Sequence, residues 1–212
     1  SQTVSFGAIT FSKAGTYKFG IAETSKAPSG VTNSTDFSTA TVKVTKDEDK
    51  ESDNYGHLTA VVTYDGLEDP HAFTNTYEAS GSWTPSVSKT LVGRALAGDQ
   101  FSFELLDASG NVIQTKKNAA DGTVAFDAIS YTQADVSSSP IAYTIHEVAP
   151  ETVPDGYTYD TQDVSVSVTL TDNGNGTIAA APTYTKGDQT AESAAFTNTY
   201  EASGSWTPSV SK

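Results

Sequence analysis

The sequence predicts an all-β protein made of tandem β-sandwich domains, and three observations support this class. Apolar residues alternate with polar ones in short runs, such as 101–105 and 164–170, which is the period of a half-buried strand. Segments rich in Asn, Asp and Gly, such as 172–176, provide turns between the runs. Finally, the stretch AFTNTYEASGSWTPSVSK occurs at 72–89 and again, unchanged, at 195–212.

The repeat sets the domain organisation. Equivalent residues lie 123 positions apart (198 − 75), which is the size of one ordinary domain and far longer than a solenoid unit. The similarity continues outside the identical stretch. Three pairs of segments match: 4–9 with 124–129, 17–23 with 141–147, and 56–64 with 176–184. The whole chain is therefore expected to be built from copies of one domain.

The matches predict the boundaries of these copies. Residues 1–79 correspond to the C-terminal part of one domain, because no counterpart of residues 81–121 precedes them. Residues 80–202 correspond to a complete domain. Residues 203–212 repeat its opening strand, and are expected to be the first strand of a following domain or a donor strand for a neighbouring chain.

Strands are expected wherever the alternation is clear, and few other elements are predicted. The segments 108–111 and 172–176 are expected to be hairpin turns, and the acidic segment 46–54 a solvated hairpin loop. The only helical signal is one short turn around 132–136.

The charge balance excludes several classes of partner. Twelve Lys and Arg residues against 26 Asp and Glu give a net charge of −14, which argues against nucleic acid or an anionic membrane surface. No apolar run is long enough to insert into a bilayer. Cysteine is absent, so disulfides, thiolate metal sites and Cys nucleophiles are excluded together. A secreted β domain without disulfides must gain its strength from core packing or from another covalent link.

One polar residue stands on each of three apolar strand faces in the second domain. Residues two apart in a strand share a side of the sheet. The three faces are Val87, Lys89 and Leu91; Tyr143, Ile145 and Glu147; and Phe196, Asn198 and Tyr200. If these faces point inward, a lysine, a glutamate and an asparagine lie in one core.

Burial of such a set favours a reaction within the protein. An apolar environment lowers the pKa of a lysine and raises that of a glutamate, so Lys89 becomes a neutral nucleophile and Glu147 a proton-carrying acid. Attack of the Lys89 amine on the Asn198 carboxamide, with Glu147 polarising the carboxamide and shuttling the proton, would expel ammonia and leave an amide bond. No cofactor or metal is needed. The alternative is that Lys89 is exposed or extends to the surface, and that Asn198 makes a turn.

The first domain repeats only part of this set. Glu23 and Asn75 occupy the places of Glu147 and Asn198, but no lysine precedes them, whereas Lys212 has the same sequence context as Lys89. Lys212 of one chain could therefore bond to Asn75 of another. The alternative is that the sequence is an arbitrary portion of a longer array.

The segments SVSKTL (86–91), TIHEV (144–148) and FTNTYEA (196–202) together resemble the streptococcal pilin isopeptide-linkage domains. These are CnaB-like, immunoglobulin-type sandwiches that occur in tandem in backbone pilins and adhesin stalks of Gram-positive bacteria. The resemblance covers the second domain and the later half of the first. It implies a self-formed isopeptide bond between Lys89 and Asn198, with Glu147, and by repetition Glu23, as the catalytic acid.

The resemblance also implies a structural shaft or stalk, outside the cell, on its surface or in a wall-attached fibre, with neighbouring copies of the same subunit as partners. The alternative is a module that binds a carbohydrate or host ligand on the same sandwich. A conventional enzyme is not expected, because His57, His71 and His146 are scattered and the acidic segment 46–54 lacks the spacing of a calcium loop.

Overall fold

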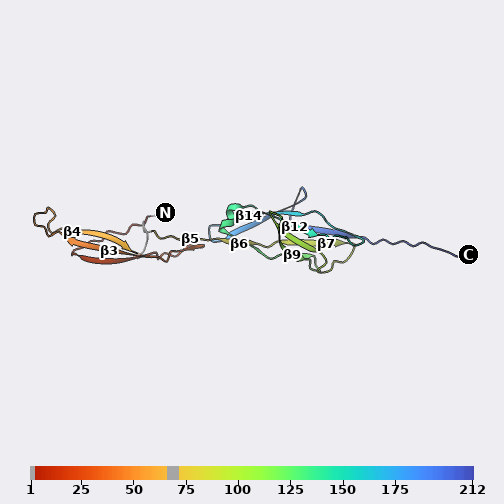
Figure 1. Ribbon diagram of the computed structural model, residues 1–212, viewed down its shortest axis with the longest axis horizontal. Coiled ribbons are helices and arrows are strands. Elements are labelled where there is room, and N and C mark those ends of the chain that lie inside the picture. Colours follow the sequence, from red (N-terminus) through yellow and green to blue (C-terminus); the bar gives the residue numbers. More distant parts are fainter. Residues whose placement is uncertain (1–2, 66–71) are drawn as a thin grey trace. The chain divides into compact units, whose positions relative to one another are not determined.

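The computed structural model describes residues 3–65 and 72–212, so His71 lies outside the described residues. The chain divides into two compact units, Ser1–Tyr77 (unit 1) and Glu78–Lys212 (unit 2). Both units consist of strands, which confirms the all-β class (Figure 1). Across the described residues, no helix has the length and apolarity of a membrane span.

Unit 1 contains a three-stranded antiparallel sheet in the order β1-β3-β4 and a short antiparallel pair, β2-β5. Its strands are β1 (Gly15–Ala22), β2 (Val31–Thr32), β3 (Phe37–Lys46), β4 (Leu58–Asp65) and β5 (Thr76–Tyr77). The acidic segment lies in the loop between β3 and β4, as expected from its composition. The pair β2-β5 brings the segment after β1 close to the end of the unit.

Unit 2 contains a four-stranded sheet, β10-β7-β17-β13, a six-stranded sheet, β16-β15-β14-β12-β8-β9, and the pair β11-β6. The first six strands are β6 (Ser80–Trp83), β7 (Ser86–Val92), β8 (Ser102–Asp107), β9 (Val112–Lys117), β10 (Thr123–Ala125) and β11 (Ile129–Thr132). The remaining strands are β12 (Ile141–Val148), β13 (Tyr157–Thr158), β14 (Val164–Asp172), β15 (Ile178–Lys186), β16 (Gln189–Ala191) and β17 (Ala194–Tyr200). One 3-10 helix, η1 (Gln133–Ser138), follows β11 at the predicted helical turn.

The predicted turns join neighbouring strands of unit 2. Residues 108–111 connect β8 to β9, and residues 173–177 connect β14 to β15. Asp107 and Asp172 accept hydrogen bonds from backbone N–H groups two residues further on, which is the Asx-turn geometry. These hairpins keep the strands of the six-stranded sheet in register.

The opening segment of unit 2 is two strands rather than one. β6 pairs with β11, whereas β7 pairs with β10 and β17. The buried Pro85 lies between β6 and β7, and a proline has no N–H to donate to a sheet ladder. The chain therefore changes sheets at this point, and the lysine expected in a first strand lies in β7.

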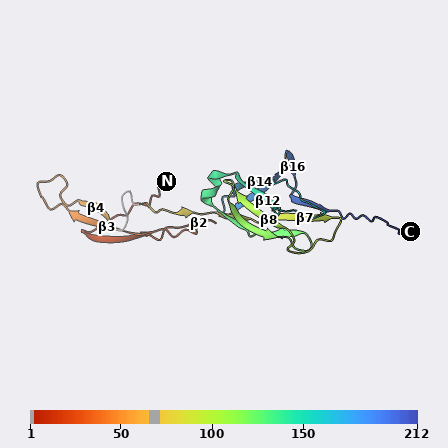
Figure 2. The ribbon, with the colours of Figure 1, turned by 45° about the vertical axis from the view of Figure 1, so that its right-hand side comes forward.

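Inward-facing residues of the two large sheets form the core of unit 2. The alternating faces predicted for β7, β12 and β17 are buried, apart from the half-buried Tyr200. The rings of Phe103 and Phe196 lie 5.4 Å apart between the sheets. Strands β7 and β12 belong to different sheets and overlap in both views (Figures 1 and 2), and a side-chain contact between Lys89 and Glu147 shows that their inward faces share one interior.

The pairing of β7 with β17 is parallel, and it fixes the position of the predicted reactive residues. Phe196 pairs with Lys89 and Asn198 pairs with Leu91, so Lys89 and Asn198 lie diagonally on neighbouring strands. In the opposite sheet, Glu147 of β12 pairs with Phe103 of β8. The side chains of Lys89, Glu147 and Asn198, which are distant in the sequence, therefore lie in the same core.

Gly122 holds β7 in place beside this interior. Its carbonyl oxygen accepts a hydrogen bond from the backbone N–H of Lys89 at 2.7 Å, and its φ is +89°. A Cβ at this position would overlap the carbonyl oxygen of Lys89. Only glycine satisfies both the left-handed backbone and the close approach.

We expect Gly122→Ala to lower the free energy of unfolding by several kcal/mol, because the backbone of β7 must move away. Gly110→Ala is the matched control: its φ is +82°, but no atom lies within 4 Å of the added Cβ. That variant should lose only about 1 kcal/mol, the cost of the left-handed conformation. Denaturant unfolding of both variants measures the difference, and equal losses would contradict the close approach.

Candidate functional site: a buried lysine, glutamate and asparagine

Lys89 lies in the core of unit 2. The residue is 3% exposed, and its Nζ atom lies 4.6 Å from the ring centroid of Phe101 and 5.8 Å from that of Phe103. The aromatic rings come from the strand region opposite β7 and exclude water from the amine. The alternative of an exposed lysine is therefore not what the structure shows.

The carboxyl group of Glu147 connects the other two residues. Its Oε2 atom lies 2.6 Å from Lys89 Nζ, and its Oε1 atom accepts a hydrogen bond of 2.6 Å from Asn198 Nδ2. Glu147 is 3% exposed and Asn198 is fully buried. One carboxyl group therefore holds the amine and the amide nitrogen side by side.

The orientation of the Asn198 side chain is fixed by a further contact. The backbone N–H of Asp160 donates a hydrogen bond of 2.8 Å to Asn198 Oδ1. Because a backbone N–H can only donate, the atom facing it must be the carboxamide oxygen. The nitrogen therefore faces Glu147, so Glu147 contacts the amide nitrogen and the backbone N–H of Asp160 contacts the oxygen.

This arrangement differs in one respect from the sequence-based mechanism, in which Glu147 polarises the carboxamide as well as moving the proton. In the structure the hydrogen bond to the carbonyl oxygen comes from Asp160. Sequence reasoning missed Asp160, because the donor is a main-chain N–H that every residue except proline carries. Its place two residues after β13, the short strand that pairs with β17, is visible only in the structure.

Burial shifts both ionisable groups toward their neutral forms. Desolvation lowers the pKa of Lys89, although the hydrogen bond and charge of Glu147 oppose this. Desolvation likewise raises the pKa of Glu147, opposed by Lys89 and by the Asn198 hydrogen bond. An amine without its proton beside a protonated carboxyl group has the chemistry required for attack on an amide.

Unit 1 contains the same arrangement without a lysine. Asn75 Nδ2 donates to Glu23 Oε1 at 3.0 Å, and the backbone N–H of Ser34 donates to Asn75 Oδ1 at 2.8 Å. Glu23 Oε2, the counterpart of the oxygen that binds Lys89, is buried and has no hydrogen-bond partner among the described residues. Lys212 is exposed, and residues 203–212 form no strand.

The remaining candidates do not form a second site. The side chain of His146 points away from Glu147 and pairs with Asp163 at 2.7 Å on the outer face of the sheet. His57 is exposed in the β3–β4 loop. Over residues 3–65 and 72–212, no group of three His, Cys, Asp or Glu residues is arranged to hold a metal ion.

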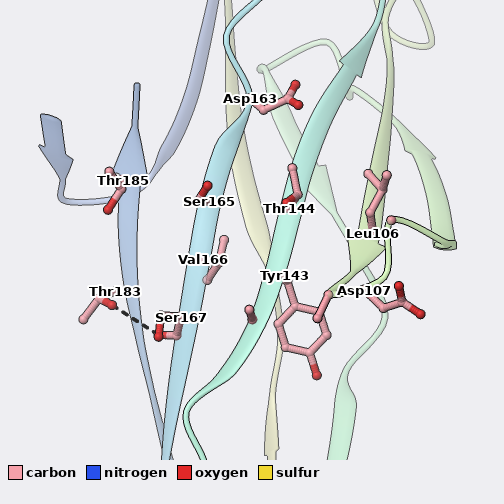
Figure 3. Close-up of a pocket in the computed structure, with 13 residues that line it drawn as sticks. Leu106, Asp107, Tyr143, Thr144, Asp163, Ser165, Val166, Ser167, Thr183 and Thr185 are labelled. Atoms are coloured by element: carbon pink, nitrogen blue, oxygen red, sulfur yellow. Dashed lines mark hydrogen bonds between the residues drawn. The ribbon is translucent and has the colours of Figure 1, made fainter. Parts of the chain in front are cut away.

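A groove crosses the outer face of the six-stranded sheet (Figure 3). Hydroxyl side chains from three strands line it, namely Thr144, Ser165, Ser167, Thr183 and Thr185, and Thr183 donates to the backbone oxygen of Ser167 at 3.2 Å. Glu147 points to the opposite face of β12 because its position alternates with that of Thr144. The groove and the buried residues are therefore separate features.

Comparison with known families supplies the family of the chain. The model of the Spy0128-like isopeptide-containing domain matches residues 1–78 and 85–201. The chain belongs to this family. Membership confirms the resemblance seen in the sequence and the CnaB-like, immunoglobulin-type sandwich class. The Spy0128-like family is one of structural isopeptide domains rather than conventional enzymes.

Three solved structures show distant similarity to this Spy0128-like chain. The major pilin of Streptococcus pyogenes is 18% identical, with 56% of this chain and 50% of that chain covered and a TM-score of 0.33. The T3.2 major pilin of S. pyogenes is 17% identical, with 90% and 69% covered and a TM-score of 0.25. The T6 backbone pilin of S. pyogenes is 12% identical, with 78% and 43% covered and a TM-score of 0.32.

The matched region spans about half the length of the S. pyogenes major pilin. A search of curated proteins found no match.

The buried pair predicts a bell-shaped pH dependence for any amide bond that this Spy0128-like domain forms. As pH rises through the lowered pKa of Lys89, the amine loses its proton and the rate should rise. As pH passes the raised pKa of Glu147, the carboxyl group can no longer give a proton to the leaving nitrogen, and the rate should fall. The pH profile of ammonia loss, followed by intact mass after cell-free synthesis, measures both limbs.

Phe101→Ala is the matched variant for this profile, because it admits water to the amine. With less desolvation, the pKa of Lys89 should rise and that of Glu147 should fall. The rate should then begin to rise at a higher pH and to fall at a lower pH, so the pH range of bond formation becomes narrower. A profile that is unchanged by this opening of the core would contradict desolvation as the cause of the two shifts.

Proposed function

We propose that the protein is a structural shaft or stalk component of a Gram-positive cell-surface fibre, locked by an autocatalytic isopeptide bond between Lys89 and Asn198. The observation that carries this proposal is the single buried carboxyl group of Glu147, which holds the attacking and the leaving nitrogen together. Membership of an isopeptide-containing family supports the chemistry. The motifs that resemble pilin domains support the extracellular location and neighbouring subunits as partners.

The topology gives such a bond a mechanical role. The chain enters unit 2 before β7 and leaves after β17, and these two strands are parallel neighbours. A pull on the two ends would slide β7 and β17 past each other. An amide between Lys89 and Asn198 would carry that load directly, so the strands between residues 90 and 197 would stay unloaded. A domain without disulfides would gain its mechanical strength in this way.

The alternative function, binding of a carbohydrate or host ligand, would use the groove on the outer sheet face. Its hydroxyl groups could hydrogen-bond to a sugar. However, among the described residues that line it, Tyr143 is the only aromatic one and is itself 8% exposed, so the groove offers little stacking surface. The buried residues favour the stalk.

We expect the intact mass of the wild-type chain to be lower than its sequence mass by one ammonia. Glu147→Ala should abolish this deficit, because no group remains to move the proton. Lys89→Ala and Asn198→Ala should abolish it as well. Lys116→Ala is the control, since Lys116 forms a surface ion pair with Asp127, and its deficit should persist.

Loss of the bond should also lower stability. The bond joins residues 109 positions apart (198 − 89). A cross-link that closes a loop of this size is expected to raise the free energy of unfolding by about 4–5 kcal/mol, because it lowers the chain entropy of the unfolded state. Lys89→Ala should therefore unfold at a clearly lower temperature and become sensitive to protease. A wild-type chain of full sequence mass would overturn the proposal.

We propose further that Lys212 of one chain bonds to Asn75 of another, with Glu23 as the acid. Glu23 Oε2, which has no hydrogen-bond partner within the described part of the chain, marks the place that the amine would occupy. Residues 203–212 have the sequence of residues 80–89 and are exposed. The covalent chain would then continue from subunit to subunit.

On a denaturing gel, concentrated wild-type protein should form a ladder of covalent multimers. Lys212→Ala, Asn75→Ala and Glu23→Ala should each give a single monomer band while keeping the ammonia deficit of unit 2. A monomer band for the wild type would refute the link between subunits and leave the bond of unit 2 untouched.

A further inference from the structure

The carboxamide oxygen of Asn198 has its own donor, separate from the Lys89–Glu147 pair. When an amine attacks an amide, negative charge develops on the carbonyl oxygen of the tetrahedral intermediate. Asn198 Oδ1 is fully buried and accepts its hydrogen bond from the backbone N–H of Asp160 at 2.8 Å. A donor fixed at this atom before reaction stabilises the charge as it forms.

The side chain of Asp160 ties this donor to β17. Its Oδ2 atom lies 2.6 Å from Lys186 Nζ and accepts a hydrogen bond of 3.0 Å from the backbone N–H of Thr197, the residue before Asn198. Lys186 Nζ also donates to the backbone oxygen of Ala195 at 2.6 Å. The carboxylate therefore bridges β15 and β17 beside the reacting amide.

The charge state of Asp160 suits this positioning role. Burial alone would raise its pKa, but the hydrogen bonds from Lys186 and Thr197 outweigh burial and lower the pKa. The carboxylate is therefore ionised at neutral pH and keeps both contacts.

Unit 1 shows the same donor with a different side chain. Ser34 follows β2 as Asp160 follows β13, and its backbone N–H donates to Asn75 Oδ1 at 2.8 Å. The Ser34 hydroxyl contacts Asp36 instead. The two units thus share the main-chain donor while the side chain that holds it differs, which identifies the N–H as the common element.

We propose that the backbone N–H of Asp160 is the oxyanion donor for bond formation at Asn198, and that the Asp160 carboxylate positions it through Lys186 and Thr197. This inference rests on the proposed Lys89–Asn198 bond. In this proposal Glu147 transfers protons at the two nitrogen atoms, and the backbone N–H of Asp160 stabilises the negative charge on the oxygen.

The reaction balances without a further reagent. The neutral Lys89 amine forms a bond to Asn198 Cγ, and the electron pair of the C=O double bond moves to Oδ1, opposite Asp160 N–H. Glu147 takes a proton from the attacking nitrogen and supplies one to Nδ2. The C–N bond to Nδ2 then breaks, ammonia leaves, and the amide C=O is restored.

An amide-to-ester exchange at position 160 tests the donor. Cell-free synthesis of the full chain can place either alanine or lactate at this position, so the two products differ only in the N–H. Both lack the carboxylate, which removes its contribution from the comparison. We expect ammonia loss in the lactate chain to be slower by about 100-fold or more than in the alanine chain, the usual effect of removing one oxyanion donor. Equal rates would overturn the proposal.

Two further comparisons keep this test independent of folding and of the proposed function. The same exchange in the Lys89→Ala background, which cannot form the bond, should leave both chains folded with similar melting temperatures. Were the all-amide wild type to lose no ammonia, the Lys89–Asn198 bond itself would be refuted. A wild type that reacts, with equal rates for alanine and lactate, would refute only the oxyanion donor.

The positioning role of the carboxylate has its own test. Asp160→Asn keeps an oxygen that can accept from Lys186 and Thr197, whereas Asp160→Ala removes it. The Asn variant should react at close to the wild-type rate, and the Ala variant about 10-fold more slowly, because its donor is less well fixed. If the Asn variant reacted as slowly as the Ala variant, the positioning role of the carboxylate would be overturned. The role of the N–H would still be decided by the comparison of alanine with lactate.

Discussion

The contact between Lys89 and Glu147 is the constraint on which the rest of unit 2 depends. Removing two charged groups from water costs several kcal/mol per ion, and their mutual attraction repays this only with good geometry. The sandwich meets the condition by placing the rings of Phe101 and Phe103 close to the Lys89 amine and by giving each oxygen of Glu147 one partner. The same desolvation favours the neutral forms, so the burial that is costly for the core would also supply the reactivity that the proposed bond requires.

The architecture explains why such a costly group can be tolerated. The three residues Lys89, Glu147 and Asn198 come from β7, β12 and β17. They therefore belong to both large sheets, and two of them lie in strands near the beginning and the end of the unit's sequence. The two sheets pack around them with alternating apolar residues, and Gly122 fixes the backbone of β7 where a larger residue would not fit. A reaction here would join strands that already touch, and would convert a network of weak contacts into one covalent path across the unit.

Comparison of the two units shows which parts of the buried arrangement are shared and which differ. The acid, the asparagine and the main-chain donor to its oxygen occur in both, through Glu147, Asn198 and Asp160 in unit 2 and Glu23, Asn75 and Ser34 in unit 1. Lysine and its aromatic cover occur in unit 2, and the half-buried Glu23 keeps one buried oxygen without a partner among the described residues. The repeated set thus remains arranged even where the amine is absent, because the short pairs β2-β5 and β13-β17 hold it.

The sequence by itself determined the fold class, the repeat and the candidate residues, since alternation in a strand decides which residues share a face and a polar residue on an apolar face is visible without a structure. It also determined that Glu23 and Asn75 copy Glu147 and Asn198. Only the tertiary structure decided that Pro85 divides the opening segment, that β7 and β17 run parallel, and that the Asn198 oxygen faces Asp160. The reason is physical. Strand pairing and main-chain donors depend on which segments meet in space, and residue identity does not reveal which backbone N–H will act as a donor, because all residues except proline have one.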